Sequence, residues 1–137
     1  MGRFAVKLKL ANDQDMTRAA DGTIPADQIR TAEIDGVVDT GATLMVLPLA
    51  VAERLGLPHG GKTFVKYADQ RRVERTVATH LDLTVCGRNA VFNAILEPDR
   101  TTALIGAVVM EVLDLLVDPG KQQLFPRDPA GTISEVE

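Results

Sequence analysis

One short run of residues in this chain could perform acid–base chemistry. Two β-branched residues precede Asp39, so its carboxylate follows the end of a strand that we expect to be buried on both faces. Thr40 adds a hydroxyl, Gly41 permits close backbone approach, and Ala42 is small. A carboxylate held rigidly at the floor of a cleft can accept or donate a proton. The alternative is a turn residue that caps the strand end and has no catalytic role.

The surroundings of Asp39 are more specific than an Asp-Thr-Gly string, which recurs by chance. An apolar run, 44–47, follows it, and a helix is then expected over 48–55, with proline in its first turn and a glycine after its end. Far downstream, 104–106 holds two large aliphatic residues and a glycine, followed by a second expected helix over 108–113. The turn at Asp39 is therefore followed, in a defined order, by helices and a distant apolar segment, and this order is more specific than the three-residue string.

Short strands must position these residues. Period-two alternation and turn signals predict about seven or eight strands, which suggests a closed or highly curved β-structure. The polar segment 12–27 is expected to be a loop or a mobile hairpin connection. The expected strands are 4–10, 29–38, 63–68, 73–79, 81–85, 90–96, 103–105 and 122–125, and residues 115–117 lead into the turn before the last of them.

Together these motifs resemble the retropepsin-like (clan AA) aspartic protease family, in its bacterial and retroelement forms. The resemblance rests on Val38 to Thr43 and on 104–106, and it spans most of the chain, from Val37 to Phe125. It implies an all-β fold, a retropepsin-like closed β-barrel with one or two short helices. It also implies a protease domain over 1–126 and a polar C-terminal tail over 127–137, which we expect to be disordered.

The resemblance assigns roles to the residues of the acidic motif. Asp39 would be the catalytic aspartate, and Thr40 would hydrogen-bond to the loop of a partner subunit. Gly41 would shape the turn and contact substrate through its backbone, with Ala42 beside it. Three residues would pack beneath this loop: Leu104, Ile105 and Gly106.

The resemblance also implies a flap, the hairpin 63–79. Three residues near its tip would lie over a substrate: Tyr67, Ala68 and Asp69. Tyr67 is the only tyrosine, and it has a second interpretation as a half-buried strand residue that merely packs. The tip lacks the glycine that is usual in mobile flaps.

The chemistry of an aspartic protease needs two carboxylates that share one proton. The chain holds one Asp-Thr-Gly motif, and Asp118 is followed by proline, which offers neither a hydroxyl nor a backbone N–H. A twofold homodimer would supply the second Asp39 by symmetry. We therefore expect an aspartic endopeptidase that needs no metal or cofactor. The alternative is an inactive dimer that binds a peptide or partner protein in the same groove.

Composition bounds the remaining classes of function. The 137 residues suit one domain with an aliphatic core, and the net charge of -4 argues against nucleic acid as a partner. No apolar stretch is long enough to span a membrane, and the first residues lack the apolar core of a signal peptide, so we expect a cytoplasmic protein.

The other chemically capable side chains receive structural interpretations. Cys86 lies in an apolar stretch and is expected to be a buried thiol rather than a nucleophile. His59 and His80 lack metal-ligand spacing. The basic run around Arg71 and Arg75 is interrupted by a glutamate and is expected to be a solvated strand face.

Overall fold

The computed structural model describes residues 3–136, so residues 1, 2 and 137 of the expected domain and tail lie outside it. These residues form nine strands, three α-helices and one 3-10 turn. No described helix is long and apolar enough to cross a bilayer. The strands are β1 (Phe4–Asn12), β2 (Thr31–Val38), β3 (Val46–Pro48), β4 (His59–Lys66), β5 (Arg72–Val85), β6 (Arg88–Glu97), β7 (Ala103–Ile105), β8 (Leu115–Asp118) and β9 (Gln123–Pro126), and the helices are α1 (Asp13–Ala20), η1 (Ala26–Gln28), α2 (Leu49–Leu55) and α3 (Ala107–Leu113).

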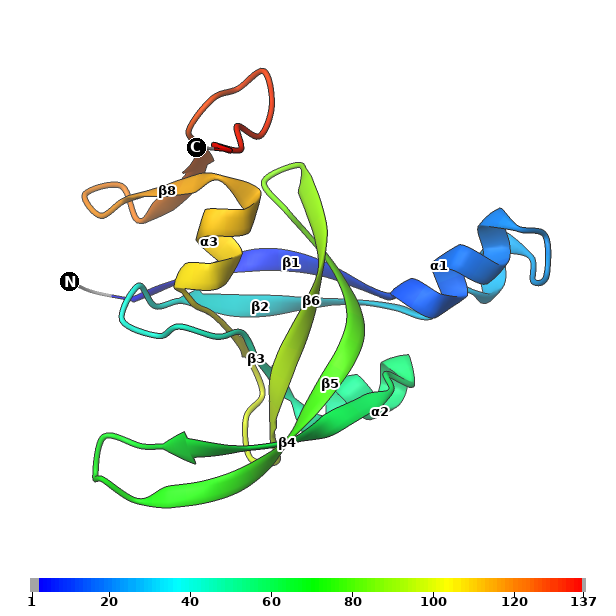
Figure 1. The fold of residues 1–137 in the computed structure, drawn as a ribbon. Coiled ribbons are helices and arrows are strands. Elements are labelled where there is room, and N and C mark those ends of the chain that lie inside the picture. The colour runs from blue at the N-terminus through cyan, green and yellow to red at the C-terminus, as the bar shows by residue number, and fades with distance from the viewer. Residues whose placement is uncertain (1–2, 137) are drawn as a thin grey trace.

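Six strands close into a barrel, which confirms the expected fold class (Figure 1). Their order is β1-β2-β7-β3-β6-β5, and β5 pairs back with β1 to complete the ring. The pairs β2–β7 and β3–β6 are parallel, and the other pairs of the ring are antiparallel. Because β7 lies between β2 and β3, the chain from β2 to β3 must pass the end of β7.

The interior of the barrel is aliphatic, as the composition predicts. Full burial of one such side chain stabilises the fold by about 1.5–3 kcal/mol relative to exposure. Five side chains from different elements are completely buried: Leu8, Leu47, Leu55, Leu81 and Ile105. The strands therefore hold one another in register through a shared core.

β5 is one long strand where the sequence predicts two, 73–79 and 81–85. The register with β6 shifts between Ala78 and Leu81, and His80 has a φ of 60°. Such an irregularity bends a strand without ending it. The first part of β5 therefore pairs with β4 in a hairpin outside the ring, and the second part belongs to the barrel wall.

The segment 12–27 is not the expected loop, and it raises the number of helices above the expected one or two. α1 forms there because Asn12 caps it, its side chain accepting the N–H of Asp15 at 3.0 Å. Asp15 in turn accepts three hydrogen bonds from Arg30, including one from Nε at 2.8 Å. Figure 1 shows this excursion projecting from one end of the barrel.

The other two helices lie where the sequence predicts them. α2 ends at Gly56, whose φ of 64° is the left-handed conformation that glycine adopts readily. α3 begins after Gly106 and packs Val109 and Leu113 into the core. Their apolar spacing made both helices predictable.

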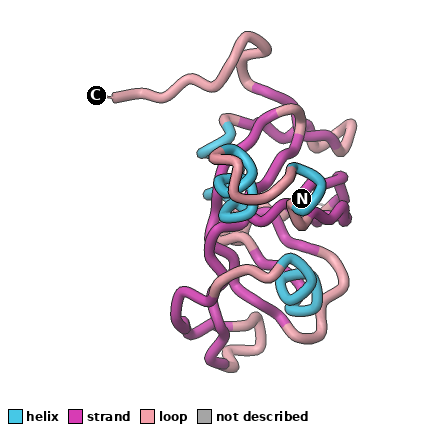
Figure 2. The backbone as a smooth tube through the Cα atoms, turned by 90° about the vertical axis from the view of Figure 1, so that its right-hand side faces the viewer, coloured by secondary structure: helices cyan, strands magenta, loops and turns pink. Residues whose placement is uncertain are grey.

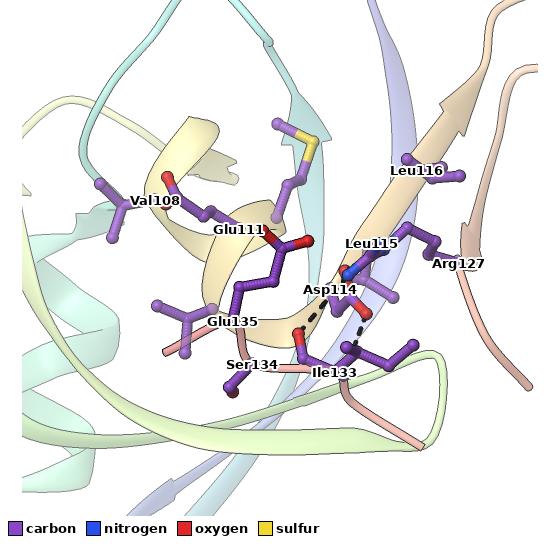
Figure 3. A pocket seen from close by; sticks show the side chains of 11 residues that line it. Val108, Glu111, Asp114, Leu115, Leu116, Arg127, Ile133, Ser134 and Glu135 are labelled. Atoms are coloured by element: carbon purple, nitrogen blue, oxygen red, sulfur yellow. Dashed lines mark hydrogen bonds and ion pairs between the residues drawn. The ribbon is translucent and has the colours of Figure 1, made fainter. Parts of the chain in front are cut away.

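A polar clamp fixes the end of α3 and the β8–β9 hairpin. Arg88 donates from Nη1 to the carbonyls of Leu113 and Asp114, at 3.0 Å each. The Asp114 carboxylate accepts from Arg127 Nε at 2.7 Å and from the backbone N–H of Ile133 at 3.2 Å, beside a cavity of about 790 Å³ (Figure 3). The Arg127 guanidinium holds the pKa of Asp114 below its ordinary value. Beyond β9 the chain runs as a loop away from the barrel (Figure 2).

Candidate active site

Asp39 lies directly after β2, at the point where that strand stops pairing with β7. Val38 pairs with Ile105 in parallel register, and both side chains are buried. The backbone N–H of Asp39 donates to the carbonyl of Ile105 at 3.0 Å. The barrel core thus fixes the backbone from which the carboxylate projects.

The turn after Asp39 orients its carboxylate. The N–H of Gly41 donates to Asp39 Oδ1 at 3.0 Å, and the N–H of Ala42 donates to the Asp39 carbonyl at 3.1 Å. A hydrogen bond from a backbone N–H to a carboxylate oxygen restricts the rotation of the side chain. The side chain therefore has one defined position.

Gly106 lets this turn rest on the end of β7. A Cβ at position 106 would lie 2.7 Å from the carbonyl oxygens of both Ala42 and Thr43. The same two carbonyls accept the N–H groups of Ala107 at 2.7 Å and Val108 at 3.0 Å. These donors belong to the first turn of α3 and would otherwise lack partners. Two of the expected supporting residues, Leu104 and Ile105, are buried below the loop.

The carboxylate itself is only partly enclosed. The Asp39 side chain is 18% exposed, and Thr40 and Gly41 beside it are exposed. Arg3 approaches from the residue before β1, with its Nη2 3.1 Å from Asp39 Oδ2. Because the Arg3 side chain is 66% exposed, this ion pair contributes little to stability and can be displaced.

The expected flap is the β4–β5 hairpin. Its tip closes through the N–H of Tyr67 donating to the Arg71 carbonyl and the N–H of Gln70 donating to the Tyr67 carbonyl, both at 2.9 Å. Gln70 has a φ of 71° and takes the left-handed position that glycine usually occupies in such hairpins. Ala68 and Asp69 are exposed at the tip. The missing glycine therefore leaves the hairpin intact.

Tyr67 is half-buried, and its hydroxyl is 2.7 Å from both carboxylate oxygens of Glu97. Arg75 Nε lies 2.5 Å from Glu97 Oε1 and 3.2 Å from the Tyr67 hydroxyl. Desolvation first, and then the Glu97 carboxylate, raise the pKa of Tyr67. These contacts support the packed interpretation of Tyr67, and its place over a substrate stays a prediction.

Several minor expectations need correction. Cys86 is exposed because it lies in the two-residue turn between β5 and β6 rather than on the inner face of a strand. Desolvation of its sulfur nevertheless raises the pKa of the thiol, which makes it a poor nucleophile. Arg71 and Arg72 are exposed as expected, whereas Arg75 is half-buried against Glu97. His80 lies 3.5 Å from an Asp13 carboxylate oxygen.

Sequence reasoning missed two residues of this region, Arg3 and Glu97. Glu97 contacts residues 22 and 30 positions away, and such pairs leave no local periodic signal. Arg3 is far from Asp39 in the sequence, and β1–β2 pairing alone brings it near. The cavity beside Asp114 is lined by α3, 114–116, Arg127 and 133–135, and the loop after Asp39 contributes none of its described lining.

Comparison with known proteins decides the family. Residues 26–112 match the family described as "gag-polyprotein putative aspartyl protease". The chain belongs to this family. The match covers more than half of the sequence and includes both Asp39 and Gly106. No curated protein sequence matches the chain.

A solved structure supports the fold of this family member independently. The chain is similar to the EIAV protease in complex with the inhibitor HBY-793, with a TM-score of 0.55 and 19% sequence identity. The similarity covers 82% of this chain and 88% of that one. At this identity the comparison establishes the retropepsin-type barrel alone. The narrower resemblance to bacterial members stays a prediction.

Proposed function

We propose that this protein is an aspartic endopeptidase whose active site contains the Asp39 carboxylates of two identical protomers. The observation that carries the proposal is the position of Asp39. It follows a buried strand, accepts the Gly41 N–H at 3.0 Å, and remains 18% exposed in a family of aspartyl proteases. A fixed and accessible carboxylate of this kind can reach a bound substrate.

A homodimer supplies the second carboxylate. The other aspartate followed by a related motif, Asp118, lies at the end of β8, where its Oδ1 accepts the N–H of Lys121 at 3.1 Å. That contact is typical of a turn residue, so it gives Asp118 a structural role rather than a catalytic one. A twofold axis beside Asp39 would pair it with its own copy, and the exposed Thr40 would be free to contact the partner.

The proposed mechanism follows from the charge of the pair. Two neighbouring carboxylates share one proton, because ionising both is costly. The ionised Asp39 takes a proton from a water molecule, whose oxygen attacks the carbonyl carbon of the scissile peptide. The protonated partner donates its proton to the carbonyl oxygen, so a tetrahedral gem-diol forms. The first Asp39 then gives the proton that it took from water to the leaving nitrogen, the partner carboxylate takes a proton from one diol hydroxyl, and the C–N bond breaks. The pair again holds one proton.

Digestion of denatured casein from acid to neutral pH, followed by mass spectrometry, tests the proposal. The wild-type protein is expected to produce internal cuts, and Asp39→Asn is expected to abolish them while the circular dichroism spectrum stays unchanged. The matched control is Asp35→Asn, since Asp35 is a nearby exposed acid paired with Lys7 at 3.0 Å. Cleavage that persists in Asp39→Asn would refute the role of Asp39. Binding of casein peptides without cleavage would favour the alternative, an inactive dimer that binds peptides in the same groove.

A further inference from the structure

Two side chains from the flap hairpin meet one carboxylate of the barrel. Tyr67 follows the end of β4 and Arg75 lies on β5, and both bind Glu97, the last residue of β6. In the hairpin register Arg75 is opposite Thr63, and Tyr67 is joined to Arg71 through a backbone hydrogen bond. Both strands of the hairpin are therefore tied to the same point on the barrel.

Hydrogen bonds connect all three side chains of this cluster. Arg75 Nε donates to Glu97 Oε1 at 2.5 Å and to the Tyr67 hydroxyl oxygen at 3.2 Å, and the Tyr67 hydroxyl donates to Glu97 at 2.7 Å. The side chains of Arg75 and Glu97 are only 21% and 14% exposed. The Arg71 guanidinium lies 4.7 Å from the centre of the Tyr67 ring and covers it.

The opposite face of the same hairpin, its outer face, carries an ion pair that is more exposed to solvent. Lys62 and Glu74 form an ion pair at 3.5 Å, but their side chains are 65% and 51% exposed. Both belong to the hairpin, so their pair joins its two strands without reaching the barrel. A charge-assisted hydrogen bond away from solvent is stronger than such an exposed pair. The Glu97 cluster is therefore the stronger restraint on the hairpin's position.

The backbone of Glu97 is fixed by the barrel. It pairs in parallel register with Pro48 of β3, and the preceding residue, Leu96, is buried in the core. Among residues 3–136, in contrast, the hairpin pairs with the rest of the sheet only through β5. Figure 1 shows it extending from the barrel below the loop that follows β2. Motion of the hairpin must break the bonds of Tyr67 and Arg75 to Glu97.

We propose that Tyr67, Arg75 and Glu97 form a latch that holds the flap closed, and that its release gates the entry and exit of peptides. Glu97 is then a positioning residue, since it acts through the flap. The gating role rests on the proposed function of the groove, whereas the latch contacts do not. Because the latch re-forms over a bound peptide, weakening it speeds entry and exit equally. The peptide affinity stays unchanged.

The single tyrosine and the absence of tryptophan provide a direct probe of the latch. The tyrosinate absorbance and the tyrosine fluorescence of the protein therefore come from Tyr67 alone. In Glu97→Gln the midpoint of the tyrosinate titration is expected to fall, because the neighbouring negative charge is removed. Quenching of Tyr67 fluorescence by acrylamide at neutral pH is expected to increase. Glu74→Gln, the matched change on the outer face, leaves both signals unchanged.

Peptide binding kinetics test the gate. Asp39→Asn serves as the background so that no cleavage occurs, and the probe is a fluorescein-labelled casein peptide that spans the main cut. Adding Tyr67→Phe or Glu97→Gln is expected to raise the association and dissociation rate constants equally, by about tenfold or more for the loss of one charged hydrogen bond. The dissociation constant is expected to change by less than about twofold. Lys62→Met is the control on the outer face.

The outcomes separate the latch from the catalytic proposal. Unchanged titration and quenching of Tyr67 in Glu97→Gln would refute the latch, whether or not casein is cut. A weaker affinity with an unchanged association rate would overturn the gate and leave Glu97 a residue that merely shapes the groove. Absence of casein cleavage by the wild type contradicts the proposed function, and the Tyr67 signals still decide the latch. Tyr67→Phe removes one hydroxyl, so a folded variant remains for measurement if Glu97→Gln unfolds.

Discussion

The turn that carries Asp39 depends on a position where no side chain fits. We predict that Gly106→Ala destabilises the protein by about 1–3 kcal/mol, as overpacking of a rigid site does. The added Cβ would lie 2.7 Å from two backbone carbonyl oxygens, which cannot rotate away as a side chain could. Urea unfolding of the variant measures the loss.

The control for this change is Gly131→Ala. A Cβ at position 131 meets no atom within 4 Å, so we expect its unfolding free energy to match that of the wild type. Casein cleavage by Gly106→Ala is expected to fall at temperatures where the variant is still folded, because the loop must shift. Equal stability of the two alanine variants would show that the loop can move away from β7 at little cost.

Single residues also show what local sequence patterns can and cannot reveal. The motif at Asp39 and the aliphatic pair before Gly106 are contiguous strings, so their place in the fold was predictable. The contact of Asp39 with Arg3 and that of Tyr67 with Glu97 join segments far apart in the chain. Only the register of the closed barrel brings such residues together.

At the scale of elements, the polar segment after β1 illustrates how composition can mislead. Its residues are polar and include Asp21-Gly22 and Pro25, so the sequence predicted a loop or a hairpin connection. The cap at Asn12 and the acids of the first turn were nevertheless present as local signals. Tertiary anchors complete the helix, since Asn12 Nδ2 donates to the Leu55 carbonyl at 2.8 Å and Asp15 binds Arg30. α1 is thus held by polar contacts rather than by a buried face.

The anchor of α1 predicts a pH dependence of stability. The hydrogen bonds from Arg30 lower the pKa of Asp15. Ionised Asp15 therefore stabilises the fold above the ordinary pKa of aspartate, and this contribution is lost as the pH falls through the lowered value. We predict that Asp15→Asn lowers stability at neutral pH by about 1–2 kcal/mol and reduces the loss of stability on acidification. Urea midpoints measured from neutral to strongly acidic pH check both effects.

An exposed acid of the same excursion provides the comparison. Asp27 lies in η1 and is exposed, so Asp27→Asn is expected to leave the urea midpoint near that of the wild type at neutral pH. If Asp15→Asn loses as much stability on acidification as the wild type does, other carboxylates cause that loss. Asp114 is the foremost of these, since Arg127 also lowers its pKa.

At the scale of the whole molecule, closure of the barrel explains why the sequence predicted strands better than their connections. β1 pairs with β5 through residues 69 to 75 positions apart, from Asn12 opposite Leu81 to Lys9 opposite Thr84. Periodicity identifies most of the strands, though not β3, and it cannot choose the partner of a strand. The family resemblance implied a closed barrel but not the order of its strands. The bend at His80, which divides β5 between the β4–β5 hairpin and the barrel, has no comparable sequence signal.

The proposed dimer makes a quantitative prediction for mixed protein. Wild type and Asp39→Asn are unfolded together in equal amounts and refolded, so that protomers pair at random. If each site needs an Asp39 from both protomers, about one quarter of the dimers keep an intact pair, because pairing is symmetric. Casein cleavage is then expected to fall to about one quarter of that of wild type at the same total concentration. A fall to only one half would mean that each protomer works alone, since dilution by an inert partner would then be the whole effect.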